Sequence, residues 1–220
     1  MKITEIYRKY KLPVNLIEHH YRVAGVALFI ADHWSGVKLD RNLVKTVALL
    51  HDLGNLVKYD LRPRFAHLLN NEENNIDYWI RLQREMIRKY GPNDYEATLG
   101  IARDLKLKPK TLKTLEDLVK GDSKEIINFG SWEIKILLYA DVRVSPYGVV
   151  SLPERVNEWL GRYKDREDWR DKMSEIEGYW QLCFGLENEI GRNLSVPVTA
   201  ITNTNNLIGK YLENLPAENI

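Results

Sequence analysis

Apolar residues recur at helical spacing along most of the chain. After Pro13 they fall at Leu16, Val23, Ala27, Ile30 and Trp34, which is typical of one buried face of a helix. We find no convincing run of alternating apolar and polar residues bounded by turns. The pattern therefore predicts an all-α chain with negligible strand.

Caps and helix breakers indicate where the first helices begin and end. A short helix should end before Pro13, and Asn15 with Glu18 three residues on resembles a capping box for the second. Asp40 should cap a third helix, which we expect Gly54 to terminate.

The second half of the chain also contains caps and helix breakers that delimit helices. Residues 55–74 are polar and irregular, and the remaining segments are predicted as helices. These run from about Asn75 to Tyr90, Asp94 to Leu105, from Pro109, from Ser131 to Ser145 before Pro146, from the capping box Ser151–Glu154, and from about Glu167 to Arg192, with a short helix and tail after them.

Composition narrows the class of protein. The 220 residues suffice for one sizeable core, and 32 Lys and Arg balance 31 Asp and Glu, so no basic excess favours nucleic acid. The one cysteine, Cys183, suits a reducing cytoplasm and a buried, structural role. The longest apolar run, Val23 to Ala31, is too short to span a membrane, and we see no signal peptide at the N-terminus. We therefore expect a soluble cytoplasmic protein that binds neither nucleic acid nor membrane.

The candidate chemistry lies in His, Asp and their neighbours. The pair His51-Asp52 follows the apolar Leu49-Leu50, Glu18-His19-His20 lies upstream, and Asp141 ends another apolar helix. Two imidazoles and two carboxylates on rigid helices form a nitrogen and oxygen ligand set. Such a set suits one divalent transition metal (Mn, Fe, Co, Ni or Zn) better than calcium.

The order His…His-Asp…Asp resembles the signature of the HD-domain phosphohydrolase superfamily, over roughly residues 15–160. The resemblance implies a single-domain, all-α HD-type helical bundle with the metal at its centre. It divides the chain into an N-terminal helix (1–14), the HD domain (15–160) and C-terminal helices (161–220) that pack on the same domain. The implied metal ligands are His19, His51, Asp52 and Asp141.

Two arguments disagree about the upstream histidine. Helical phase places His20 nearest the centre of the apolar stripe and His19 at its edge. The family pattern Glu-His-Ser-x-x-Val-Ala aligns with Glu18 to Ala24 and selects His19. We follow the alignment, because a ligand should point into a polar site beside the core.

A finer resemblance follows His51. The 5'-deoxynucleotidase branch has His-Asp-x-x-Glu-x-x-x-x-Asp-x-Pro, and here Asp60 and Pro63 match the end of that run while Asn55 replaces the first acid. An amide cannot transfer a proton as a carboxylate does. Activity on deoxynucleoside monophosphates should therefore be weak unless Asp60 fills the role; otherwise Asp60 is a loop cap.

The number of histidines predicts one metal ion and not two. Binuclear HD proteins need two further histidines between the His-Asp pair and the last Asp, and only His67 lies there. A phosphate would need positive charge nearby, which Arg22, Lys58, Arg62 or Arg64 could supply. We favour Arg22, because it lies three residues after His19 on the same side of its helix.

The expected function is metal-dependent hydrolysis of a phosphate ester of a small molecule, with a nucleotide monophosphate as one substrate class. Asp52 and Asp60 are the expected catalytic residues, and Arg22, Lys58 and Asn55 the expected substrate-binding residues. The alternative is a metal-stabilised nucleotide-binding or regulatory HD domain without turnover. The expected partner is a small phosphorylated substrate. A homodimer would use some of the six tryptophans, which suit a core or an interface equally.

Overall fold

The structure is a computed structural model that describes residues 1–62, 69, 75–163, 172–201 and 209–220. Its α-helices are α1 (Ile3–Lys9), α2 (Val14–Asp32), α3 (Arg41–Leu50), α4 (Ile76–Tyr90), α5 (Asp94–Asp104), α6 (Pro109–Lys120), α7 (Ser123–Phe129), α8 (Trp132–Val142), α9 (Leu152–Tyr163), α11 (Met173–Arg192) and α12 (Gly209–Asn214). Short 3₁₀ turns are η1 (Asn55–Lys58), η3 (Val198–Ala200) and η4 (Leu215–Ala217). The all-α prediction is confirmed.

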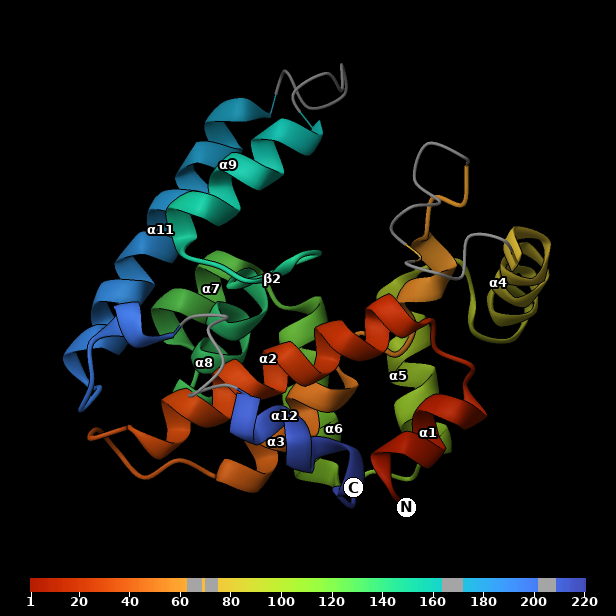
Figure 1. The fold of residues 1–220 in the computed structure, drawn as a ribbon, viewed down its shortest axis with the longest axis horizontal. Helices are drawn as coiled ribbons and strands as arrows, with labels where there is room; N and C mark the ends of the chain where they lie inside the picture. Colours follow the sequence, from red (N-terminus) through yellow and green to blue (C-terminus); the bar gives the residue numbers. More distant parts are fainter. Residues whose placement is uncertain (63–68, 70–74, 164–171, 202–208) are drawn as a thin grey trace.

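The long helix α2 crosses the molecule and forms the centre of the core (Figure 1). Every residue from Val23 to Ile30 is buried, because α2 is covered on one side by α3 and α8 and on another by α12. A helix that is buried all round must be apolar all round, and this stretch contains no charged residue. α2 is therefore a fixed support for the side chains at its ends.

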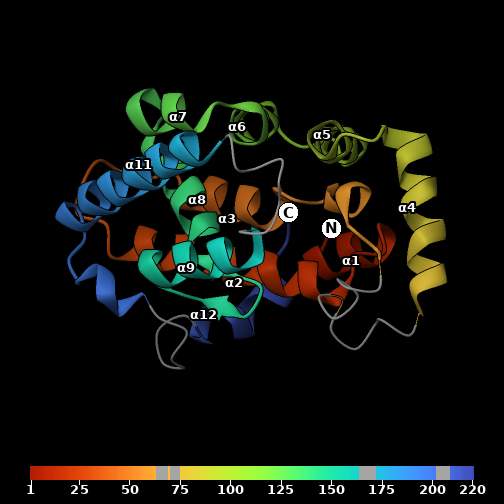
Figure 2. The same cartoon turned by 90° about the horizontal axis from the view of Figure 1, so that it is seen from above.

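Helices α3 and α8 pack together against α2. α8 is buried at each position from Ile134 to Ala140, with α6, α7 and α11 against its other faces. The view in Figure 2 shows α5, α6 and α7 in a row along one side, with α9 and α11 near one end and α4 standing at the other.

The two ends of the chain lie together (Figure 1). The amide of Ile3 donates to the carbonyl of Glu218 at 3.0 Å, and the amide of Ile220 donates to the carbonyl of Met1 at 3.0 Å. α1 and η4 thus close the bundle next to each other.

Several predicted caps are confirmed. The Asp40 side chain accepts from the Leu43 amide, and the Ser131 side chain accepts from the Ile134 amide at the start of α8. In the capping box before α9, the Ser151 amide donates to Glu154 at 2.8 Å and the Glu154 amide to Ser151 at 3.3 Å. These local interactions depend only on neighbouring residues, which is why the sequence predicts them.

Three local predictions are wrong. Helix α2 begins one residue before Asn15, with Pro13 at the N-cap, and the Asn15 side chain accepts from the adjacent Leu16 amide at 2.9 Å. Helix α3 ends at Leu50, and Gly54 has φ −89°, so it is no left-handed cap. The helix after Ser131 ends at Val142 instead of Ser145.

The chain after α8 forms a small hairpin in place of the expected helix end. Strand β1 (Val144–Ser145) pairs antiparallel with β2 (Gly148–Val149). The Ser145 hydroxyl donates to the Gly148 carbonyl and accepts from the Tyr147 amide, both at 3.1 Å. Local side-chain bonds of this kind favour a turn over a continued helix.

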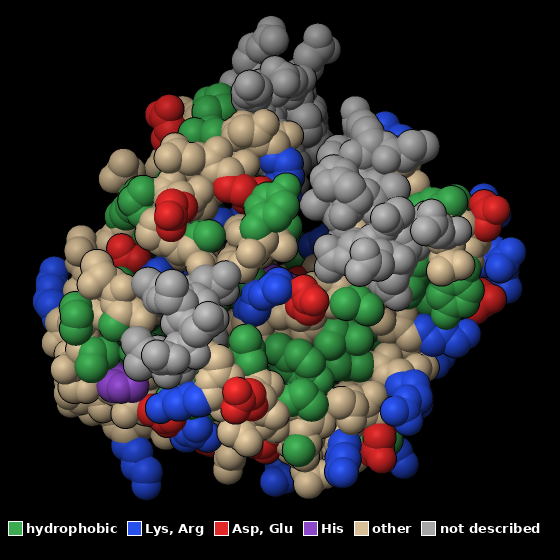
Figure 3. Space-filling view, in the orientation of Figure 1, with side chains coloured by type: hydrophobic (Ala, Val, Ile, Leu, Met, Phe, Trp, Pro, Cys, Tyr) green, Lys and Arg blue, Asp and Glu red, His purple; other side chains and the backbone are tan. Residues whose placement is uncertain are grey.

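The surface is mixed in charge. Figure 3 shows acidic and basic side chains interspersed over the face it displays, in line with the near balance of charges in the sequence. Among the helices that the structure describes, none combines the length and apolar character needed to cross a bilayer.

Candidate metal centre

Three potential ligands from distant parts of the sequence meet beside the core. His19 comes from α2, His51 directly follows α3, and Asp141 lies near the end of α8. The Nε2 atoms of His19 and His51 are 3.2 Å apart. An Asp141 carboxylate oxygen lies 3.1 Å from the His19 Nε2 and 3.5 Å from the His51 Nε2.

Asp52 borders the same point. Its Oδ2 lies 3.7 Å from the His19 Nε2 and 3.8 Å from the His51 Nε2. The structure thus brings together all four residues that the resemblance implied as ligands, with Asp52 slightly farther out than the other three.

The spacing of these atoms fits one small cation. Ligand atoms about 2.0–2.1 Å from a common ion lie about 2.8–3.4 Å from each other in tetrahedral or octahedral arrangements. The separations within the group His19, His51 and Asp141 are 3.1–3.5 Å. Two imidazoles and carboxylates also form the donor set that first-row transition metals bind. The residues present therefore fit a divalent metal of that kind.

His51 is oriented by its own helix. Its Nδ1 lies 2.8 Å from the Ala48 carbonyl, which can only accept, so Nδ1 carries the proton and Nε2 is left to bind a ligand. Burial lowers the pKa of His51, but the carboxylates of Asp52 and Asp141 outweigh it and raise the pKa to about 9. Without a metal, the ring is therefore a cation at neutral pH.

Asp141 is the acidic counterpart of the two histidines. Burial by itself would raise its pKa, but hydrogen bonds from His19 and His51 hold the pKa of Asp141 well below the usual range. The carboxylate is therefore charged at neutral pH, as a metal ligand has to be.

His20 lies behind the ligand group, in the core. Its side chain is fully buried, packs 5.4 Å from the Tyr7 ring and 5.2 Å from the His51 ring, and has neither ring nitrogen hydrogen-bonded to the described residues. Burial and the neighbouring histidines His51 and His19 lower its pKa well below 6.5. His20 is thus neutral, and His19 is the residue whose Nε2 faces His51.

Asn55 acts on Asp52. Its side-chain amide is buried at the start of η1 and donates to the Asp52 Oδ2. Its own Oδ1 is buried and has no hydrogen-bond partner among the described residues. The amide therefore fixes a carboxylate beside the metal site, a task that an acid could not perform while charged.

Lys58 is the predicted cation that lies near the ligands. Its ammonium donates to Asp94 at 2.6 Å, and the side chain is half exposed. Burial alone would lower the pKa of Lys58. The charge of Asp52 and the hydrogen bond to Asp94 outweigh this effect, so the pKa of Lys58 is above its usual value. Arg22 instead pairs with Glu18 at 2.9 Å, one turn earlier on α2.

Asp60 has a local partner. Its carboxylate accepts from the Arg62 backbone at 3.1 Å and from the Arg62 guanidinium at 2.7 Å. This arrangement is that of a loop cap, and the catalytic role of Asp60 stays a prediction. Arg64 and His67 lie outside the described residues.

Arg143 has a structural role. Its buried guanidinium donates to the Ile201 carbonyl at 2.7 Å and to the Tyr139 hydroxyl at 2.5 Å, and it lies 3.4 Å from Glu187. It joins α8 to α11 and to the turn η3.

A cleft of about 960 Å³ opens beside Asp141. Its walls come from α7, α8, α9 and α11, and include Trp159, Tyr179 and Trp180. Sequence reasoning did not find this cleft. The tryptophan content was its only signal, and that signal could not separate a cleft from a core.

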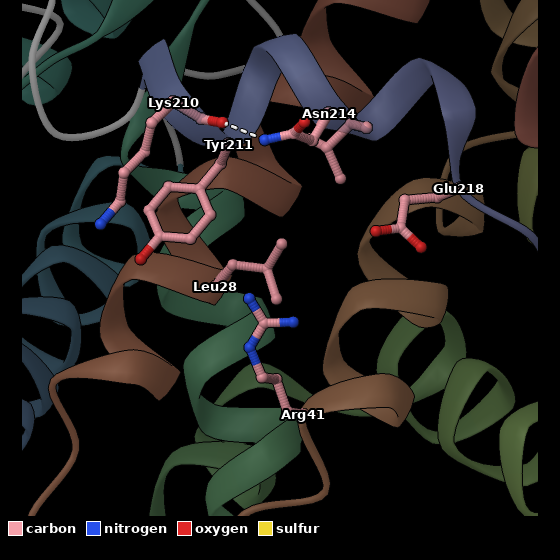
Figure 4. Close-up of a pocket in the computed structure, with 7 residues that line it drawn as sticks. Leu28, Arg41, Lys210, Tyr211, Asn214 and Glu218 are labelled. Carbon is pink, nitrogen blue, oxygen red and sulfur yellow. Dashed lines mark hydrogen bonds between the residues drawn. The ribbon is translucent and has the colours of Figure 1, made fainter.

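A second cavity of about 330 Å³ lies where α12 covers α2 and α3 (Figure 4). Leu28 of α2, Arg41 of α3, and Lys210 and Tyr211 of α12 line it. Arg41 is paired with Asp32 at 2.6 Å, and Asp32 also accepts from the Tyr211 hydroxyl at 2.8 Å. These bonds join the C-terminal helix to the core, away from the metal ligands.

The fold and site define an all-helical protein with a cluster of histidine and aspartate side chains that could hold a metal ion. The family model of the HD domain matches residues 16–119, the segment that holds His19, His51 and Asp52. The chain is therefore similar to the HD domain over this segment, and Asp141 lies beyond it. No curated protein and no solved structure matches the chain.

Proposed function

We propose that this protein is a metal-dependent hydrolase of phosphate monoesters of small molecules, with nucleoside monophosphates as the first class to test. The observation that carries the proposal is the convergence of His19, His51 and Asp141, with Asp52 beside them, at the edge of an open cleft. Proteins with an HD domain are generally metal-dependent phosphohydrolases, which agrees with this chemistry.

The metal would polarise the phosphoryl group and lower the pKa of a bound water. The chain's own residues would orient the reactants. Asp52 has two carboxylate oxygens, of which Oδ2 accepts from Asn55. Held in this way, Asp52 can accept a hydrogen bond from the attacking water and direct its lone pair towards phosphorus.

Lys58 would hold the phosphate in place. The negative charge of Asp52 helps to raise the pKa of Lys58, so the ammonium is charged at neutral pH. A half-exposed lysine can leave Asp94 to meet an incoming anion. Asp60 is the candidate acid for the leaving oxygen, and Arg22 the candidate second cation.

The test begins with elemental analysis of the purified protein, followed by a phosphatase screen with Mn²⁺, Co²⁺ and Ni²⁺. We expect about one metal per chain and release of inorganic phosphate. The variant His51→Ala should lose both. His33→Ala is the matched control, because His33 follows the far end of α2, where its Nδ1 lies 2.9 Å from the Phe29 carbonyl. Metal binding without turnover of any phosphate ester would contradict the proposal.

A further inference from the structure

The cleft beside Asp141 is large compared with the metal site itself. Asp141 and Val142 of α8 line it, and α9 and α11 supply most of the remaining wall. A volume of about 960 Å³ is in the range that accommodates ligands larger than a phosphate group. A phosphate ester bound at the metal would therefore extend its leaving group into this cleft.

Aromatic rings form one part of the wall. The Trp180 ring lies 6.2 Å from the Trp159 ring, edge to face, and 5.3 Å from the Tyr179 ring. Trp159, Tyr179 and Trp180 all line the cleft. Such rings can stack on planar aromatic ligands, including nucleic-acid bases.

The same wall holds hydrogen-bond donors without acceptors. Trp180 is only 7% exposed, and its indole Nε1 is buried without a hydrogen-bond partner among the described residues. Arg155 also lines the cleft; its Nε is buried without a partner among the described residues, while its Nη1 donates to Glu158. Buried donors of this kind usually have a partner, so each indicates an acceptor beyond the residues that the structure describes.

We propose that this cleft is a specificity pocket for a leaving alcohol that carries a planar aromatic group with hydrogen-bond acceptors, such as the purine base of a nucleoside, with Trp180 as its main specificity residue. The inference rests on the proposed phosphatase function, which it deepens. It assigns substrate selection to α9 and α11, outside the segment that matches the HD domain.

Adenosine and ribose form a pair of probes that differ in the presence of the base. Neither carries a phosphate group, so their binding is measured without hydrolysis. Titration calorimetry on the metal-loaded full chain should show adenosine binding and no ribose binding. Trp180→Leu should weaken adenosine binding about tenfold or more, the effect typical of losing one stacked base. Trp180→Phe keeps a ring and removes only the N–H, so its loss should be smaller, about two- to tenfold.

Trp132→Phe is the matched control, because Trp132 begins α8, nine residues before Asp141, and packs on Trp34 at 4.8 Å. It should leave adenosine binding unchanged, and thermal melting checks that each variant folds. If Trp180→Leu does not fold, Trp180→Phe carries the test.

Steady-state kinetics then compare the hydrolysis of adenosine 5'-monophosphate and ribose 5-phosphate. In both substrates the phosphate is esterified to the primary hydroxyl of ribose. Trp180→Phe should raise KM for the first and not for the second. Equal binding of adenosine and ribose, or adenosine binding that no Trp180 variant changes, would overturn the specificity pocket. Adenosine binding that depends on Trp180, in a protein that hydrolyses no phosphate ester, would support the pocket and overturn only the proposed function.

Discussion

His51 uses its two ring nitrogens in different ways. Nδ1 is committed to the Ala48 carbonyl, so a metal and a proton must compete for Nε2. The nearby carboxylates of Asp52 and Asp141 attract either cation, which is why the pKa of His51 is raised to about 9 in the metal-free protein. The residues that create the site therefore also make it sensitive to pH.

We expect metal affinity to rise about tenfold per pH unit from about pH 7 to pH 9, because one proton must leave His51 for each ion bound, and to level off above pH 9. Calorimetry in buffers of different ionisation enthalpy measures this proton release. The raised pKa also stabilises the metal-free fold, fully below about pH 6.5 and progressively less as the pH rises through 9. A metal affinity that is flat from pH 7 to 9 would show that His51 is already neutral.

Lys58→Gln should raise KM for a phosphate monoester about three- to tenfold, because a half-exposed ammonium near the site is replaced by a neutral amide. The effect should shrink at high salt, where screening weakens the charge of Lys58. Lys113→Gln is the matched control, since Lys113 is also half exposed or more and paired, with Asp117 at 2.5 Å. Equal KM values for the two variants at low salt would remove Lys58 from substrate binding.

At the scale of elements, the site depends on how the turn after α3 packs against α5. The Gly54 amide donates to the Thr98 hydroxyl at 2.9 Å, and a Cβ on Gly54 would lie 2.4 Å from the Thr98 nitrogen and 2.7 Å from the Asp94 carbonyl oxygen. Backbone atoms cannot move aside as a flexible side chain can. Gly54 is required for close approach of the two segments and not for a left-handed cap.

Gly54→Ala should therefore lower the free energy of unfolding by about 1–3 kcal/mol and weaken metal binding, because the segment that holds Asp52 must shift. Gly185→Ala is the opposite control: Gly185 is exposed within α11, where an added Cβ meets nothing within 4 Å, and alanine should stabilise that helix by up to about 1 kcal/mol. Urea unfolding of both variants gives the comparison. A neutral Gly54→Ala would mean that the turn relaxes freely.

The elements also show what a sequence can and cannot predict. Asp40, Ser131 and the Ser151–Glu154 box depend on contacts within four residues, and the structure confirms them. The role of Gly54 was misjudged, because its partner Thr98 is 44 residues away. The position of Asp141 beside His19 was expected only from resemblance to a family, since spacing alone cannot bring α8 next to α2.

At the scale of the whole molecule, the ligands join parts of the fold that are remote in sequence. α2 supplies His19, the turn after α3 supplies His51 and Asp52, and α8 supplies Asp141. An ion bound to all of them links three helices that also form the centre of the core. Metal binding should therefore stabilise the folded molecule and not only the site. The cleft lined by α9 and α11 likewise depends on how helices that are separate in sequence pack together, so no local sequence pattern predicted it.

At a Mn²⁺ concentration one hundred times its dissociation constant, we expect the free energy of unfolding to rise by about 2.7 kcal/mol and the melting temperature by about 5–10 °C. Asp141→Ala should lose most of this increase, whereas His33→Ala should keep it. Differential scanning calorimetry with and without metal measures both. A melting temperature that Mn²⁺ does not change would contradict a resident metal site, unless another of the candidate ions restores the shift.

The hydrogen bonds between Met1 and Ile220 and between Ile3 and Glu218 have a further consequence for the order of the chain. A short linker could join the two ends, and the chain could be reopened at the exposed Gly121, between α6 and α7. In such a circular permutant Asp141 would precede His19, yet every helix would keep its neighbours. The permutant should still bind the metal, because the site depends on where the helices lie in space and not on their order in the sequence.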